Sequence, residues 1–168
     1  PAAGVKGAMA TAALETAGVN KTSVNRLIFL PQTNINIWGK PYLKIDVVRS
    51  ADMNRTPDMR TRAYLPNWCA EVEIRFATPN FSARSISSLV QNAGQLIGLG
   101  DFRQEKGRGS FGTFSIAGEE LGEYQELWDE IMQEGRSVQE LARDNPECAD
   151  QDTAELMQFL QEERLRRA

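Results

Sequence analysis

The segment WCAEVEIRF, Trp68 to Phe76, with SARSISSLVQNAGQLI over residues 82–97 after it, decides the expected fold. Apolar and charged side chains alternate along the first segment, which is the two-residue period of a strand with one buried side and one solvent-facing side. In the second segment, apolar residues recur at helical spacing, and Ser82 stands where a helix N-cap belongs. The two segments predict a half-buried strand followed by an amphipathic helix.

The preceding and following segments extend this pattern into an α+β domain. Residues 1–16 predict a helix, whereas Arg26–Leu30, Tyr42–Val48 and Thr113–Ile116 predict further strands. The resulting order is helix, strand, strand, strand, helix, strand. This order predicts a ferredoxin-like fold, in which an antiparallel sheet carries helices on one face.

The C-terminal part of the chain predicts three more helices. An amphipathic pattern that ends at Gly135 predicts the first of them. The spacings Ser137–Glu140 and Asp152–Glu155 are those of capping boxes, and they predict the starts of the other two.

Charge divides the chain at the same place. Residues 1–117 contain fourteen Lys/Arg and eight Asp/Glu, a balance of +6, whereas residues 118–168 contain five and fifteen, a balance of −10. We therefore expect a basic α+β core domain followed by an acidic helical extension. The extension is a docking or self-assembly element, a competitor for the basic face, or a solvated tail without a partner.

Composition argues against most enzyme classes. The chain has no histidine, which removes the usual general base and the commonest metal ligand, and Cys69 and Cys148 are too far apart for a zinc cluster. Glu71 and Glu73 share the polar side of the predicted strand, but alternation alone places them there. No apolar run is long enough to span a membrane. We expect a cytoplasmic, non-enzymatic protein without cofactor or metal.

A glycine-rich loop is the first candidate binding element. GRGSFG, Gly107 to Gly112, has the spacing of a nucleotide-binding fingerprint, but a helix precedes it and a strand follows it, which is the reverse of a dinucleotide fold. The wider loop, residues 98–112, combines glycines, cations and aromatic side chains, which suits single-stranded nucleic acid. Its candidate contacts are Phe102, Arg103, Lys106, Gly107, Arg108, Gly109 and Gly112. The alternative is a flexible connection with Phe102 and Phe111 buried in the core.

A second basic segment is RSADMNRTPDMRTRAY, residues 49–64, which predicts a loop or hairpin. Arg55, Arg60 and Arg62 are candidate phosphate or base contacts, because a guanidinium can grip phosphates with two hydrogen bonds or stack on bases. The alternative is a structural network in which Asp58 and the nearby Asp52 pair with these arginines.

Two motifs carry a resemblance to a known family. The opening PAAGVKGAMATAA, Pro1 to Ala13, and the segment LIGLGDFRQEKGRGSFGTFSI, Leu96 to Ile116, resemble the Lys-Gly helix and the glycine-rich loop of the RAMP superfamily of CRISPR effector proteins. The resemblance implies a ferredoxin-like core that binds single-stranded RNA or DNA through backbone contacts and often polymerises along it. It carries over Lys6 from the first motif, and Arg103, Lys106 and Arg108 from the second, as phosphate contacts.

The sequence therefore predicts a non-enzymatic protein that binds single-stranded nucleic acid and assembles as a multimer or within a larger nucleoprotein complex. The alternative is a structural or assembly subunit of a phage particle or another large protein complex, in which the same loops are protein interfaces.

Overall fold

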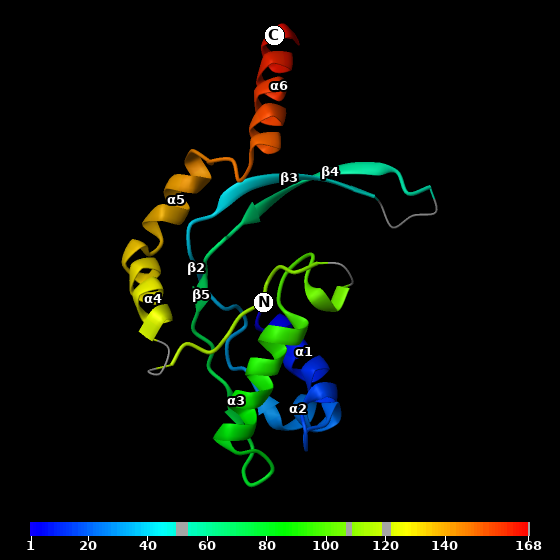
Figure 1. Cartoon of the computed structure of the whole chain (residues 1–168), viewed down its shortest axis with the longest axis vertical. Coiled ribbons are helices and arrows are strands. Elements are labelled where there is room, and N and C mark those ends of the chain that lie inside the picture. Colours follow the sequence, from blue (N-terminus) through cyan, green and yellow to red (C-terminus); the bar gives the residue numbers. More distant parts are fainter. Residues whose placement is uncertain (50–53, 107–108, 119–121, 168) are drawn as a thin grey trace. The chain divides into compact units, whose positions relative to one another are not determined.

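The computed structural model combines helices with short two-stranded sheets, so the α+β class is confirmed (Figure 1). It describes residues 1–49, 54–106, 109–118 and 122–167.

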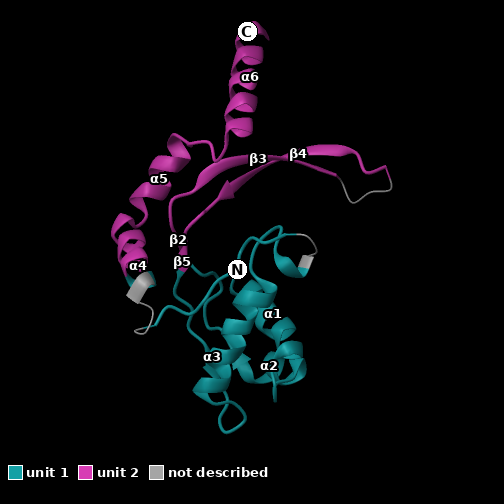
Figure 2. Ribbon diagram, viewed as in Figure 1, with its two compact units in different colours: residues 1–36, 70–125 teal, residues 37–69, 126–168 magenta. Residues whose placement is uncertain are grey.

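The chain folds into two compact units, and each of them is discontinuous in sequence (Figure 2). Unit 1 comprises Pro1–Asn36 and Ala70–Gln125, and unit 2 comprises Ile37–Cys69 and Glu126–Ala168. This division differs from the expected boundary after residue 117, because residues 37–69 belong with the C-terminal helices. Backbone hydrogen bonds join these two parts of unit 2: the Leu43 N–H donates to the Glu147 carbonyl at 2.7 Å, and the Ala149 N–H donates to the Leu43 carbonyl at 2.8 Å.

Unit 1 is a helical core with one short sheet. Its elements are α1 (Ala2–Ala12), η1 (Ala13–Glu15), α2 (Lys21–Leu27), β1 (Ile28–Phe29), β6 (Arg75–Phe76), α3 (Ala83–Asn92), η2 (Ala93–Ile97) and η3 (Gln104–Lys106). Met9, Val24, Ile28 and Leu89 are fully buried where α1, α2, β1 and α3 pack together. The predicted N-terminal helix and the helix after Ser82 are therefore confirmed, whereas α2 was not predicted.

Ser82 starts α3 as the sequence predicts. Its hydroxyl accepts a hydrogen bond from the Ser85 N–H at 3.2 Å, and the Ser85 hydroxyl accepts one from the Ser82 N–H at 2.9 Å. This reciprocal arrangement satisfies two backbone donors that the helix cannot satisfy itself.

The predicted strand over residues 68–76 is present only at its two ends. Cys69–Ala70 forms β5 and pairs with β2 (Ile37–Trp38), and Arg75–Phe76 forms β6 and pairs with β1. Between them the expected alternation of exposure is kept, but the hydrogen-bond partner is a side chain. The Gln32 amide donates to the Glu71 carbonyl at 3.4 Å and accepts from the Glu73 N–H at 3.0 Å. One amide thus takes the place of a neighbouring strand.

The closing strand predicted over residues 113–116 is not formed. The Phe114 N–H donates to the Gly94 carbonyl at 3.3 Å, and the Ile116 N–H donates to the Gln91 side chain at 3.3 Å, so this segment is bound to the α3–η2 helix instead of a strand. Among the described residues the strands form three two-stranded sheets, and the four-stranded ferredoxin-like sheet is not among them.

Unit 2 contains a long hairpin and three helices (Figure 1). Its main elements are β3 (Tyr42–Arg49), β4 (Pro57–Tyr64), α4 (Gly122–Glu134), α5 (Ser137–Asp144) and α6 (Gln151–Arg167), of which the first residues of α4 belong to unit 1. β3 and β4 pair antiparallel from Tyr42 opposite Tyr64 to Arg49 opposite Pro57. The predicted strand from Tyr42 is confirmed, and Pro57–Tyr64, within the segment expected to form a loop or hairpin, is the second strand of the hairpin.

The C-terminal helices begin at other residues than the capping-box spacings predict. α4 ends before Gly135, as predicted, and this glycine has a φ of +59°. Ser137 is the first residue of α5 and its hydroxyl donates back to the Glu134 carbonyl, so it is not an N-cap. Asp150 takes the role predicted for Asp152, because its carboxylate accepts the N–H of Thr153 at 2.8 Å.

Candidate nucleic-acid interface

The glycine-rich loop over residues 98–112 is closed by its own backbone. It begins at Gly98, where the helix ends with a φ of +75°. The Leu99 N–H donates to the Gly112 carbonyl at 2.8 Å, and the Phe111 N–H donates to the Phe102 carbonyl at 3.3 Å. These bonds bring the two arms of the loop together at two levels, so it is an ordered connection in the part that the structure describes.

Two of the predicted contact glycines serve this closure. A Cβ atom at Gly109 would meet the Phe102 carbonyl, and one at Gly112, whose φ is +70°, would meet the Leu99 carbonyl. Only glycine allows the backbones to approach so closely. Close packing of the backbone within the loop therefore explains why Gly109 and Gly112 are glycines. That they also let the loop approach a phosphate stays a prediction. Gly107 lies outside the described residues.

The aromatic side chains of the loop are at the surface. Phe102 is 62% exposed and Phe111 is 42% exposed, and their ring centroids are 5.9 Å apart. The alternative that both rings are buried in the core is therefore wrong. Phe102 has a φ of +56°, in the left-handed region that residues with a side chain rarely adopt. The loop thus holds an exposed aromatic pair in a specific backbone conformation.

The cations of the loop are not equally available. The Arg103 guanidinium donates to Glu105 at 2.8 Å and 3.0 Å and to the Gly100 carbonyl at 2.9 Å. Its hydrogen bonds therefore stabilise the loop itself. Lys106 ends η3, but its side chain lies outside the described residues, as does the whole of Arg108.

Lys6 lies in unit 1 on α1, outside the loop. Its ammonium group donates to the Asn25 carbonyl at 3.0 Å and lies 5.8 Å from the centroid of the exposed Phe29 ring. Lys6 thus links α1 to the residues around β1, and a phosphate contact there stays a prediction.

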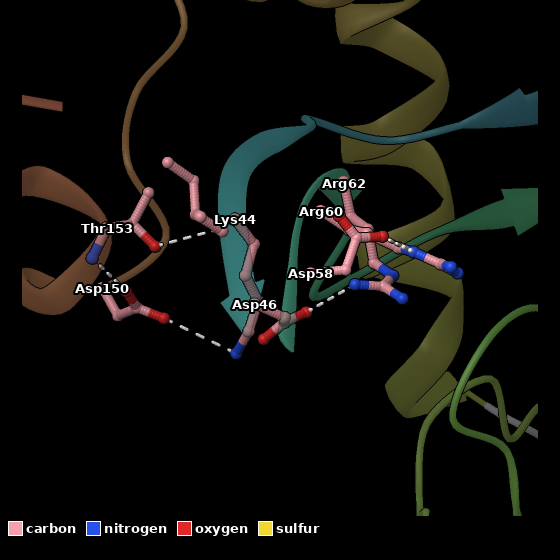
Figure 3. Close-up of polar contacts among 8 residues, drawn as sticks. Lys44, Asp46, Asp58, Arg60, Arg62, Asp150 and Thr153 are labelled. Atoms are coloured by element: carbon pink, nitrogen blue, oxygen red, sulfur yellow. Dashed lines mark hydrogen bonds and ion pairs between the residues drawn. The ribbon is translucent and has the colours of Figure 1, made fainter. Parts of the chain in front are cut away.

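The predicted arginines of the hairpin pair with carboxylates of the same hairpin (Figure 3). Arg60 lies 3.1 Å from Asp58, and Arg62 lies 3.2 Å from Asp46. Arg55 precedes β4, is exposed and has a φ of +45°. The network expected as an alternative therefore exists in part, with Asp46 as the acidic partner that the sequence did not indicate, while Asp52 lies outside the described residues.

The acidic extension supplies further carboxylates to the same hairpin. Lys40 lies 2.8 Å from Glu147, and Lys44 lies 3.5 Å from Asp150 (Figure 3 shows the second pair). The hydrogen bond to Glu147 raises the pKa of Lys40. Hydrogen bonds from Thr153, with a smaller contribution of Lys44, lower the pKa of Asp150. Charge matching between the hairpin and the extension thus accounts for part of the charge division along the sequence.

The acidic side chains do not form a metal centre in the part of the chain that the structure describes, where no three Cys, Asp or Glu side chains cluster suitably. Glu73 instead pairs with Arg75 at 2.7 Å, on the exposed side of the 68–76 segment.

Sequence reasoning did not single out Lys40, Tyr42 and Lys44 as site residues. Lys40 precedes β3 and Tyr42 and Lys44 alternate with apolar residues along it, so this pattern was readable, but the carboxylates that contact the two lysines lie more than a hundred positions away. No helix of the described chain is long and apolar enough to cross a membrane.

Comparisons with protein-family models, curated proteins and solved structures found no match to this chain.

Proposed function

We propose that the chain is a non-enzymatic protein that binds single-stranded RNA or DNA in the cytoplasm. The observation that supports this proposal best is the exposed pair of Phe102 and Phe111 on the glycine-rich loop. Bases stack on exposed aromatic rings regardless of their sequence, and each such contact contributes about 1–3 kcal/mol. An exposed ring pair held by an ordered loop fits this use better than it fits core packing.

Phosphate contacts come from the cations that adjoin the ring pair in sequence. Lys106 and Arg108 are the candidates in the loop, whereas Arg103 positions the loop through Glu105. Cations that neutralise phosphates release counterions, so affinity falls as the salt concentration rises. The proposed interface therefore combines sequence-independent stacking with a salt-dependent backbone contact.

Kinship with the RAMP superfamily, including a ferredoxin-like core and assembly along the nucleic acid, belongs to the same proposal. It is supported by the two motifs, of which residues 1–13 fold into α1 and its flanks and residues 96–116 contain the glycine-rich loop. Exposed apolar side chains of the acidic extension, such as Phe159 and Leu165 on α6, offer surfaces for self-association or for other subunits.

The direct test is a fluorescence-polarisation titration of labelled single-stranded RNA and DNA at several salt concentrations, starting at about 50 mM. The double substitution F102A/F111A is expected to weaken binding about tenfold or more. L14A is the control, because Leu14 is an exposed apolar residue of unit 1 outside the loop. Absence of binding by the native protein at low salt, or an equal loss in both variants, would overturn the proposal.

A structural or assembly subunit of a phage particle or other large complex is the second candidate function. It is favoured by Val47 and Met59, which face each other across the hairpin and are 68% and 55% exposed. Exposed apolar side chains that lie together on one face of a hairpin are typical of protein interfaces. Light scattering with and without nuclease separates the candidates, since nuclease-resistant assembly favours the structural one and nuclease-sensitive assembly favours the nucleic-acid one.

A further inference from the structure

One face of the β3–β4 hairpin lines up lysine and tyrosine side chains. Lys44 lies opposite Arg62, and Tyr42 lies opposite Tyr64, so all four side chains belong to the same face of the ladder. Lys40, two residues before Tyr42, has its ammonium group 5.1 Å from the centroid of that ring. The Lys44 ammonium group lies 5.6 Å from the centroid of Tyr64.

Lys40, Tyr42, Lys44, Arg62 and Tyr64 are called the strip below. An extended segment of the chain itself is bound beside it. Residues 147–149 run parallel to β3 and exchange two backbone hydrogen bonds with Leu43. The segment places the Glu147 carboxylate on Lys40 and the Asp150 carboxylate on Lys44, and Figure 3 shows Asp150 directed at the lysine. Two anionic groups three residues apart on an extended backbone thus meet two cations that each lie beside an aromatic ring.

An open groove of about 430 Å³ lies next to the strip. It is lined by Tyr42 and Arg62 of the hairpin and by Gln139 and Arg143 of α5, among others. The guanidinium groups in its wall are paired, Arg62 with Asp46 and Arg143 with Asp144, so the groove adds the Tyr42 ring and open space beside the lysines.

We infer that Lys40, Tyr42, Lys44 and Tyr64 form a second site for a single-stranded nucleic acid, and that Glu147 and Asp150 occupy its phosphate positions when no nucleic acid is bound. This inference rests on the proposed function and adds to it a site in unit 2 and a competitor from the same chain. Carboxylate oxygens stand in for the non-bridging oxygens of phosphates, since both are anionic acceptors that lysine binds.

The displacement of the carboxylates by phosphates is physically feasible. The ion pairs of Lys40 and Lys44 are partly exposed to solvent, and pairs of this kind are weak and screened by salt. The backbone bonds at Leu43 do not involve the carboxylates, nor does the hydrogen bond that the Ile45 N–H donates to the buried Thr153 hydroxyl. The extension therefore remains docked while Glu147 turns away from Lys40 and the Lys44 ammonium group moves off Asp150, whose carboxylate keeps its hydrogen bond with the Thr153 N–H.

The test removes the competing charges without removing the structure. E147Q/D150N keeps an oxygen acceptor at both positions, and asparagine is as good an N-cap for α6 as aspartate. D152N/E155Q makes the same change in net charge at the same spacing, at two exposed residues of α6. K40Q/K44Q removes the cations of the site itself.

Polarisation titrations with the same labelled oligonucleotides measure the affinity of each variant and compare it with that of the native protein. We expect E147Q/D150N to bind about fivefold more tightly, which is the scale of two exposed ion pairs. Its salt dependence should steepen by about 0.7 per lysine that gains a phosphate. K40Q/K44Q should bind more weakly, and D152N/E155Q should stay within about twofold of the native protein.

The outcomes separate this inference from the proposed function. If F102A/F111A abolishes binding while E147Q/D150N binds as the native protein does, the proposed function stands and the second site is refuted. An equal gain in E147Q/D150N and D152N/E155Q also refutes it, because the effect is then one of net charge. A gain in affinity confined to E147Q/D150N supports the competing carboxylates, and no binding by any of the proteins refutes both proposals.

Discussion

The glycine-rich loop of unit 1 and the β3–β4 hairpin of unit 2 both combine cations with aromatic rings, but they leave different groups available to a ligand. In the loop, Arg103 is turned onto Glu105 and the aromatic rings are exposed. In the hairpin, the tyrosines are partly buried beside lysines, and the cations pair with carboxylates of the hairpin and of the extension. A count of charges and rings therefore does not say which of them a ligand can reach, because that depends on partners elsewhere in the chain.

The largest expected effect tests whether the loop is held by its own backbone. Gly112→Ala places a Cβ against the Leu99 carbonyl at a φ of +70°, so the free energy of unfolding should fall by about 2–4 kcal/mol. Chemical denaturation followed by circular dichroism measures it. Gly100→Ala is the control, since its φ is +82° but no atom lies within 4 Å, and it should cost about 1 kcal/mol. Equal losses of unfolding free energy in the two variants would show that close packing at Gly112 does not stabilise the loop.

The next effect tests whether the extension is anchored to the hairpin independently of charge. Thr153→Val leaves the buried Ile45 N–H without its acceptor, which should reduce the free energy of unfolding by about 2 kcal/mol. Hydrogen exchange at the Ile45 amide should accelerate in the same variant. Thr22→Val changes an exposed threonine of α2 and should be nearly neutral, and a comparable loss there would contradict the anchoring role.

A smaller effect concerns the cap of α6. Because hydrogen bonds from Thr153 lower the pKa of Asp150 below 3.8, the ionised cap stabilises the fold above that pH and its contribution is lost as the pH falls through the lowered pKa. Helical circular dichroism that depends on Asp150 should therefore be constant near neutrality and decrease only below about pH 4. Asp150→Ala should reduce the helical signal at neutral pH, whereas Asp150→Asn should keep it. Equal signals in the two variants would exclude the capping role.

The smallest effect concerns the ion pairs within the hairpin. Arg60 and Asp58 are both about half exposed, so Arg60→Gln should change the free energy of unfolding by less than about 0.5 kcal/mol. Denaturation at low and high salt should show that this small difference shrinks as the salt concentration rises, because exposed ion pairs are screened. A loss well above 1 kcal/mol would mean that the pair is structural, and the hairpin would then differ from the loop less than the contacts indicate.

Local patterns predicted those elements whose hydrogen bonds are local. The helix after Ser82, the strand from Tyr42 and the end of the helix before Gly135 follow from caps, alternation and glycine. The broken strand over residues 68–76 could not be predicted, because the Gln32 amide that replaces its partner lies about forty positions away.

The sequence predicted which residue types make up the candidate site, but not which of their side chains a ligand can reach. The sequence singled out Phe102 and the loop cations, but exposure depends on how the loop closes on Gly109 and Gly112, which a single sequence does not reveal. The pairs Lys40–Glu147 and Lys44–Asp150 join positions more than a hundred residues apart. Such long-range pairs are set by the packing of unit 2 and have no local signal.

The left-handed backbone at Phe102 has a consequence for how this loop evolves. A residue with a side chain at a φ of +56° costs about 1–2 kcal/mol relative to glycine. Glycine or asparagine would therefore make the fold more stable, while an exposed phenylalanine adds little burial in return. Under the proposed function, position 102 is therefore expected to show a stability–activity trade-off, in which substitutions that raise the melting temperature are those that remove the ring.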